Sequence, residues 1–136
     1  MKIYTASFFD TRERIRQFAD QLWKRGHEVT SSWLNEVARP EHMSVKEFWK
    51  KLAIKDLAEI RASDLVILDT IDTTPRGGRE VEFGFALGQF QTKSIWRVGP
   101  VRNVFHELVD RAYESWEELM KDIPDLKSVP ENPKGK

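Results

Sequence analysis

The sequence contains no cysteine, which excludes a disulfide framework and thiolate chemistry. It has no apolar run that approaches the roughly 18 to 20 residues of a membrane-spanning helix, and we expect no membrane association. Lysine plus arginine and aspartate plus glutamate both number 22, so no basic excess favours a polymeric nucleic acid as partner. The chain begins on a strand pattern and not on a signal sequence, and we therefore expect a cytoplasmic protein.

The histidines His27, His42 and His106 do not have the spacing of metal ligands, and we expect neither a metal site nor a cofactor. A length of 136 residues with 40% hydrophobic content is sufficient for the core of one domain. We expect that domain to span residues 1–123. Residues 124–136 are rich in lysine, proline and glycine, and we expect a flexible C-terminal tail there.

Strand and helix patterns alternate along the chain. Strands are predicted over residues 2–6, 27–33, 64–69 and 94–98, and helices over residues 11–25, 44–61, 104–112 and 115–123. Ser44 and Ser115 each begin a capping box at the start of a helix. This order predicts a three-layer α/β fold, flavodoxin-like or Rossmann-like, with a central parallel sheet. In such folds ligands bind outside the carboxyl ends of the strands.

One more helix is predicted from the stretch 76–90, which reads Arg-Gly-Gly-Arg-Glu-Val-Glu-Phe-Gly-Phe-Ala-Leu-Gly-Gln-Phe. Gly77 and Gly78 permit a tight turn and the close approach of a ligand. The following dozen residues are apolar almost all round the helix, which predicts a buried helix. Glu80 and Glu82 lie in its first turn, where the helix dipole favours an ionised carboxylate by roughly 0.3 to 1 kcal/mol. Glu82 is therefore a candidate nucleophile, and the alternative is that both glutamates only complement the dipole.

Three segments together resemble the nucleoside 2-deoxyribosyltransferase family, which includes related deoxynucleoside 5′-monophosphate N-glycosidases. They read Ile-Tyr-Thr-Ala-Ser-Phe-Phe from residue 3, Ala-Ser-Asp-Leu-Val-Ile-Leu-Asp from residue 62, and Gly-Arg-Glu-Val-Glu-Phe-Gly-Phe-Ala-Leu-Gly from residue 78. The resemblance implies that Glu82 attacks the anomeric carbon of a 2′-deoxynucleoside, expels the base and holds a covalent deoxyribosyl intermediate. It also implies that the hydroxyl of Tyr4 orients this carboxylate. Without the resemblance, Tyr4 is an ordinary strand aromatic.

Further site residues are expected in the loops at the same edge of the sheet. Asp69 and Asp72 are candidates for binding the sugar hydroxyls or for protonating the leaving base, the alternative being strand-end and turn roles. Phe9 and Trp33 are candidates for enclosing the base.

The two arginines that flank the glycines, Arg76 and Arg79, invite an anion, because guanidinium groups and the N–H groups near Gly78 at a helix start suit a phosphate. The alternative is that one arginine pairs with Glu80. Asn103 is either a helix cap or, as the resemblance implies, a residue lent to a neighbouring subunit's site. We therefore expect a homodimer or a larger homo-oligomer.

The function that the resemblance implies is cleavage of the N-glycosidic bond with transfer of the deoxyribosyl group to another base. One alternative is hydrolysis of a nucleoside 5′-monophosphate with release of free base, which the two arginines favour. A second alternative is a catalytically silent nucleotide sensor that keeps the fold and the pocket. In all three cases the partner is a small nucleoside or nucleotide.

Overall fold

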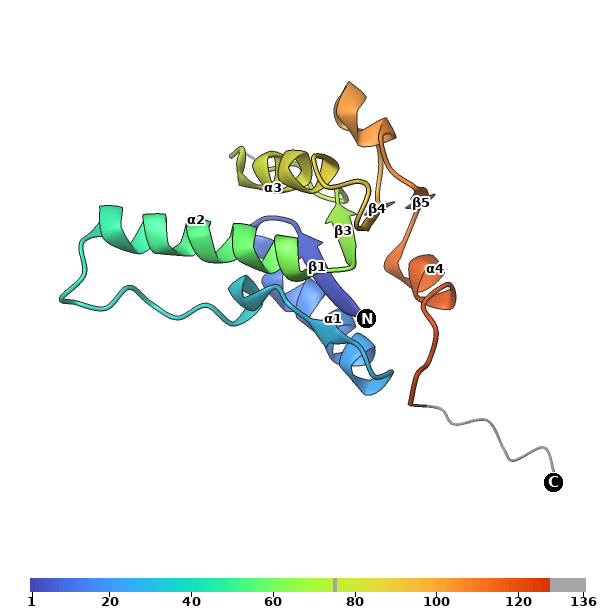
Figure 1. The fold of residues 1–136 in the computed structure, drawn as a ribbon, viewed down its shortest axis with the longest axis horizontal. Coiled ribbons are helices and arrows are strands. Elements are labelled where there is room, and N and C mark those ends of the chain that lie inside the picture. The colour runs from blue at the N-terminus through green and yellow to red at the C-terminus, as the bar shows by residue number, and fades with distance from the viewer. Residues whose placement is uncertain (75, 128–136) are drawn as a thin grey trace.

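The computed structural model describes residues 1–74 and 76–127. Its centre is a sheet of five parallel strands in the order β2-β1-β3-β4-β5 (Figure 1). The strands are β1 (Lys2–Ala6), β2 (Glu28–Val29), β3 (Leu65–Asp69), β4 (Ser94–Val98) and β5 (Arg111–Tyr113). All five residues of β3 are buried, as expected for the most apolar strand of a parallel sheet. The strand order is that of flavodoxin-like folds, and the predicted fold class is confirmed.

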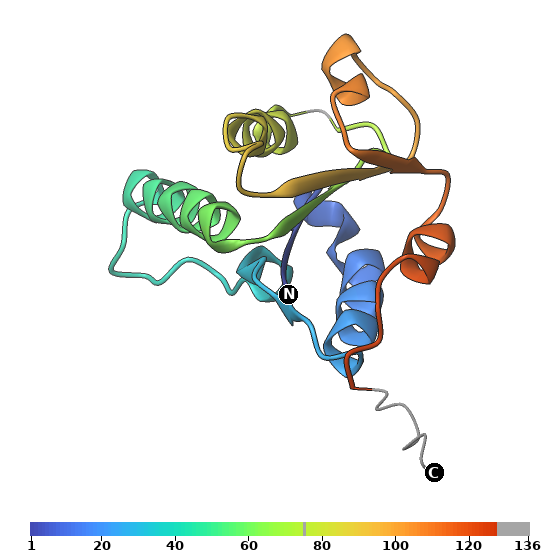
Figure 2. The ribbon, with the colours of Figure 1, turned by 45° about the vertical axis from the view of Figure 1, so that its right-hand side comes forward.

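Helices cover both faces of the sheet (Figure 2). One face carries α1 (Arg12–Lys24) and α4 (Trp116–Lys121), and the other carries α2 (Val45–Ala62) and α3 (Gly78–Leu87). Phe18 of α1 and Trp116 of α4 stack with their ring centroids 4.9 Å apart. Three short 3-10 helices lie in the loops, namely η1 (Phe9–Thr11), η2 (Ser32–Asn35) and η3 (Val104–Glu107).

Ser44 and Ser115 cap the starts of α2 and α4 as predicted, through the hydroxyl-to-backbone half of each capping box. The hydroxyl of Ser44 accepts a hydrogen bond from the Glu47 N–H at 3.1 Å, and that of Ser115 accepts one from the Glu118 N–H at 3.2 Å. Each cap satisfies a backbone donor that would otherwise have no partner in the helix.

Two predicted elements were wrong in extent or type. The strand predicted over 27–33 is only Glu28–Val29, because the following residues turn into η2 and the Ser31 hydroxyl takes the Thr5 N–H instead. The helix predicted over 104–112 is the short η3 followed by strand β5, which pairs with Trp96–Val98 of β4. This pairing joins segments distant in sequence, which local helix patterns do not report.

The prediction that the helix after Gly78 is buried all round was also wrong. Phe83 and Ala86 are buried, whereas Val81 is 63% exposed. The helix α3 lies beside α2 and packs on the sheet with one face only. Apolar side chains on its other face are therefore exposed to solvent. Gly77, which precedes α3, has φ −91, and Gly78, its first residue, does not have a positive φ either.

The first residues of the predicted tail make specific contacts near the end of α1. The Leu126 N–H donates to the Arg25 carbonyl at 2.7 Å, and the His27 ring contacts the Pro124 carbonyl at 2.7 Å. The rest of the predicted tail, residues 128–136, lies outside the described residues. None of the helices in the described part of the chain is long and apolar enough to cross a membrane.

Candidate active site

A cleft of about 240 Å³ opens at the carboxyl ends of β1, β2 and β3. This is where parallel α/β folds bind their ligands. The structure brings together in its lining six residues predicted from the sequence, namely Phe9, Trp33, Arg76, Gly78, Arg79 and Glu82. Apart from its chain neighbours and the backbone of its own helix, a Cβ atom at Gly78 would meet no heavy atom of the described residues within 4 Å, so the backbone there is open to a ligand.

A direct hydrogen bond joins Tyr4 and Glu82 at this cleft. The Tyr4 side chain rises from the middle of β1, is fully buried, and its hydroxyl donates to Glu82 Oε2 at 2.9 Å. The other carboxylate oxygen, Glu82 Oε1, is shielded from solvent and has no hydrogen-bond partner among the described residues. A buried polar atom without a partner is rare. Glu82 therefore presents one fixed and one uncommitted oxygen to the cleft.

The electrostatics of Glu82 differ from the prediction that a helix start would favour its ionised form. Burial and, after it, the nearby Asp56 carboxylate raise the pKa of Glu82 to about 8, against the opposing effect of the hydrogen bond from Tyr4. Glu82 also lies one residue beyond the first turn of α3, where the helix dipole is weaker. Burial and like charge therefore outweigh the dipole.

Asp56 is a site residue that the sequence analysis missed. It lines the same cleft, and its Oδ1 is buried without a partner among the described residues. Burial and, after it, the carboxylates of Glu59 and Glu36 raise the pKa of Asp56 to about 7. The available signal was a carboxylate in an apolar stripe, because Phe48, Leu52, Asp56 and Ile60 recur every four residues along α2. A charged residue at such a position needs a partner or a function.

The structure places Asp69 and Asp72 outside the lining of this cleft, on the side of α1. The buried Asp69 carboxylate accepts from Arg14 Nη1 at 2.7 Å, Trp116 Nε1 at 2.8 Å and the Ile71 N–H at 3.0 Å. Asp72 accepts from Arg14 Nη2 at 3.0 Å and is half exposed. In this arrangement Asp69 joins α1, α4 and β3, and the predicted substrate roles of both residues stay predictions.

Phe9 and Trp33 stand at the cleft with different freedom. Trp33 is buried and its Nε1 donates to the Thr5 carbonyl at 2.8 Å, so its ring is fixed. Phe9 is 42% exposed and carries the Arg12 guanidinium 4.0 Å above its ring. Their role in enclosing a base remains a prediction.

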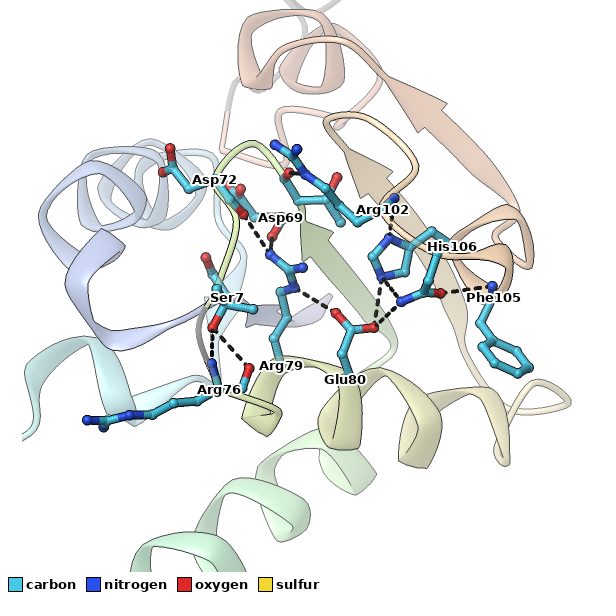
Figure 3. A network of polar contacts seen from close by, with 12 residues as sticks. Ser7, Asp69, Asp72, Arg76, Arg79, Glu80, Arg102, Phe105 and His106 are labelled. Atoms are coloured by element: carbon cyan, nitrogen blue, oxygen red, sulfur yellow. Dashed lines mark hydrogen bonds and ion pairs between the residues drawn. The ribbon is translucent and has the colours of Figure 1, made fainter.

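The two arginines near the glycines have separate environments (Figure 3). The Arg79 side chain is buried, and its Nε donates to Glu80 Oε2 at 3.0 Å, as the alternative interpretation expected. Its Nη1 donates to the carbonyls of Asp69 and Asp72 at 3.3 and 2.9 Å. Arg76 is exposed at the cleft. The Arg76 guanidinium is therefore more accessible to an anion than the Arg79 guanidinium.

Glu80 is the centre of a polar network that joins α3 to the loop around η3 (Figure 3). Its Oε1 accepts from His106 Nε2 at 2.8 Å and from the Asn103 amide at 3.0 Å. The other ring nitrogen, His106 Nδ1, accepts the Arg102 N–H at 3.0 Å, which assigns the proton to Nε2. Glu80 thus faces His106 while Glu82 faces the cleft, as expected for helix positions two residues apart.

Asn103 caps η3 in this structure, because its Oδ1 accepts the Phe105 N–H at 2.9 Å. The helix-cap interpretation is confirmed, although the element that it caps is a 3-10 helix. Its place in a neighbouring subunit's site remains a prediction.

The network predicts that His106 is important for stability. His106→Ala should lower the free energy of unfolding by about 2 to 4 kcal/mol, because it leaves a cavity beside the Phe83 ring and removes the donor to Glu80. Urea unfolding would measure the change. The matched control is His42→Ala, at an exposed histidine, which should change stability little. Equal small effects of both substitutions would contradict this account of the network.

The fold and the cleft define an α/β protein with buried carboxylates at the carboxyl ends of a parallel sheet. Its structure is similar to a 2-deoxyribosyltransferase from Bacillus psychrosaccharolyticus, with a TM-score of 0.71 and 21% sequence identity, covering 88% of this chain and 90% of that chain. It is also similar to a CMP N-glycosidase from Clostridium botulinum, with a TM-score of 0.59 and 20% identity, covering 89% of this chain and 97% of that chain. No protein-family model and no curated protein matches the sequence.

Proposed function

We propose that this protein cleaves the N-glycosidic bond of a nucleoside or nucleotide, with Glu82 as the nucleophile. The observation that carries the proposal is the hydrogen bond from the Tyr4 hydroxyl to Glu82 Oε2. It leaves Glu82 Oε1 at the cleft without a hydrogen-bond partner among the described residues. The names of the two similar structures refer to a deoxyribosyltransferase and a nucleotide N-glycosidase, which agrees with the motif resemblance. Family membership is part of this proposal.

The chemistry follows from two carboxylates with different tasks. Glu82 Oε1 attacks the anomeric carbon, and the electron pair of the breaking C–N bond goes to the base, which takes a proton from Asp56. An oxocarbenium-like transition state forms next to Glu82, and the Tyr4 hydrogen bond holds the carboxylate in place. Water or a second base then attacks the anomeric carbon and releases Glu82. Asp56 accepts the proton of the incoming nucleophile.

In the reactive form Asp56 is protonated and Glu82 is ionised, so the two carboxylates share a single proton. In the free protein the pKa of Glu82 is about 8 and that of Asp56 about 7, so the pair holds a proton near neutral pH. Positive charge developing on the sugar favours an ionised Glu82 and so shifts the proton to Asp56.

The direct test is a substrate panel with chromatographic detection of free base. Deoxynucleosides and their 5′-monophosphates are incubated with the protein, with and without a free acceptor base. Base release only when an acceptor is present indicates transfer, and release in water alone indicates hydrolysis. If ligands bind but no substrate releases its base, the result would contradict the proposed enzymatic activity and favour a nucleotide sensor.

The exposed Arg76 at the cleft favours the 5′-monophosphate hydrolase as the second candidate function. Arg76→Ala should lower kcat/KM for a monophosphate about 10- to 100-fold and for its nucleoside far less, because a guanidinium bond to a phosphate is charge-assisted. The matched control is Arg111→Ala, at an exposed arginine on β5, which should alter neither. Equal losses on both substrates after Arg76→Ala would remove Arg76 from phosphate binding.

A further inference from the structure

A second cavity lies next to the cleft, between the loop that follows η2 and the helix α2. It measures about 390 Å³, and we call it the loop groove. Figure 1 shows the loop running alongside α2 toward the N-terminal end of that helix. Glu36 and Leu52 line both the loop groove and the cleft, so the two cavities adjoin at these two residues.

The cleft alone is small for a ligand site. Small-molecule sites usually measure about 300 to 1,000 Å³, and the cleft has about 240 Å³. Together with the loop groove the space falls within the usual range. A ligand that fills the whole space is therefore larger than one that fills the cleft.

The leaving base is the part of the substrate nearest the loop groove. Arg76 and Glu82 line the cleft but not the loop groove, and they are the proposed contacts of the phosphate and the sugar. Asp56, the proposed proton donor to the base, lies one helical turn after Leu52 on the same face of α2. A base in contact with Asp56 therefore reaches the border that Leu52 and Glu36 share.

The loop groove is polar at its inner end and apolar beyond. At the inner end the Ser32 hydroxyl is buried without a partner among the described residues, and the Glu36 carboxylate lies at the border. Such groups suit the polar edge of a base. Further out, the lining consists mainly of Val37, Pro40, Met43 and Phe48. These side chains cannot pair polar atoms, and they favour an apolar group.

We propose that the loop groove is a second subsite of the cleft and binds an apolar substituent carried by the leaving nucleobase. An exocyclic amine with an alkyl or aryl group fits this arrangement, because it keeps one N–H for the Glu36 carboxylate while its substituent enters the loop groove. Lys51 and Lys55 also line the loop groove. The charge of Lys55 already acts on Glu36 and Asp56, so it is offset by carboxylates. This inference rests on the proposed glycosidic cleavage.

The experiment compares three substrates that differ only at the exocyclic amine. They are 2′-deoxyadenosine 5′-monophosphate and its N6-benzyl and N6-carboxymethyl derivatives, and kcat/KM is measured from base release. The benzyl derivative should be favoured about 10- to 100-fold over the unsubstituted nucleotide, as expected for burying a phenyl-sized group. The carboxymethyl derivative should not gain. A larger gain for it than for the benzyl derivative would overturn the apolar assignment.

Matched variants on one helix locate the effect. Phe48→Ala should reduce the ratio of kcat/KM between the benzyl and unsubstituted substrates by about tenfold, whereas Trp49→Ala, at a side chain 66% exposed, should leave the ratio and the activity unchanged. Met43→Asp places a charge in the loop groove without altering α2, and it should also reduce the ratio. An unchanged ratio in both groove variants would overturn the inference.

The outcomes separate this inference from the proposed function. Cleavage of the unsubstituted nucleotide with no gain for the benzyl derivative would overturn the subsite and leave the proposed function intact. No cleavage of these three substrates or of any member of the deoxynucleoside and 5′-monophosphate panel would overturn both.

Discussion

Glu82→Gln should reduce base release by about 10⁴-fold or more, because the reaction loses its covalent nucleophile. Glutamine keeps the shape of the side chain and an acceptor for the Tyr4 hydroxyl, so the cleft should stay intact. Single-turnover measurement of free base at saturating substrate gives the effect on the chemical step. A loss that appears only in KM would contradict the nucleophilic role.

Stability separates this loss from unfolding. Native Glu82 has a pKa of about 8 against an ordinary value of 4.5, so the folded state binds its proton more tightly than the unfolded state does. Stability from this group is therefore present at low pH and is lost as pH rises between those values. Glutamine does not ionise and so does not lose this stability as pH rises. The unfolding temperature of Glu82→Gln at neutral pH should therefore be no lower than that of the parent.

Two further substitutions of glutamate are the controls for Glu82→Gln. Glu80→Gln lies on the same helix but faces His106 and Arg79, so it should reduce activity far less. Glu117→Gln, at an exposed residue of α4, should have no effect. A Glu80→Gln variant as inactive as Glu82→Gln would show that network disruption alone explains the loss.

Asp56→Asn should remove one limb of the pH profile and lower kcat about 10²- to 10⁴-fold. The two carboxylates titrate near pH 7 and pH 8. Because one must be ionised and the other protonated, the parent rate should rise through the lower value and fall through the upper one. Asparagine cannot supply the proton, so the alkaline limb should disappear. The remaining limb should rise through the pKa of Glu82 alone, which should lie below about 8 because the Asp56 charge that helps to raise it is gone.

A substrate with an activated leaving group gives a sharper version of this test. 4-Nitrophenolate leaves without protonation, so a 4-nitrophenyl deoxyriboside should be cleaved by Asp56→Asn almost as fast as by the parent. Measuring kcat against pH for this substrate and for a natural nucleotide separates proton donation from positioning. An equal loss on both substrates, with both limbs of the profile retained, would contradict the role of Asp56 as the acid.

Local sequence signals predicted the parts of the fold and site that depend on neighbouring residues. The buried β3, the caps at Ser44 and Ser115, and the helix that carries Glu82 all follow from short patterns. The positions of Tyr4 and Glu82 came from motifs that resemble a known family, and the structure brings the two side chains into hydrogen-bond contact. Whether Glu82 acts as the nucleophile is a question for the experiments above.

Features that depend on distant residues were not predictable in the same way. Strand β5 exists because Arg111–Tyr113 pairs with β4, and its residues alone resemble the end of a helix. Asp69 ends β3 as predicted, but Arg14 and Trp116, from two other helices, engage its carboxylate. The pKa of Glu82 likewise depends on Asp56 of another helix. Asp56 belongs to an apolar stripe that the sequence shows, but the sequence does not show that Asp56 shares a cleft with Glu82.

Chemical trapping tests the central claim, a covalent bond between the sugar and Glu82, most directly. A 2-deoxy-2-fluoro nucleoside or nucleotide destabilises the oxocarbenium-like state and slows breakdown of the intermediate. After incubation and proteolysis, mass spectrometry should find a fluorinated sugar adduct on the peptide that contains Glu82, and no such adduct in Glu82→Gln. An adduct on Asp56, Glu80 or another carboxylate, or base release from this substrate without any adduct, would contradict the account.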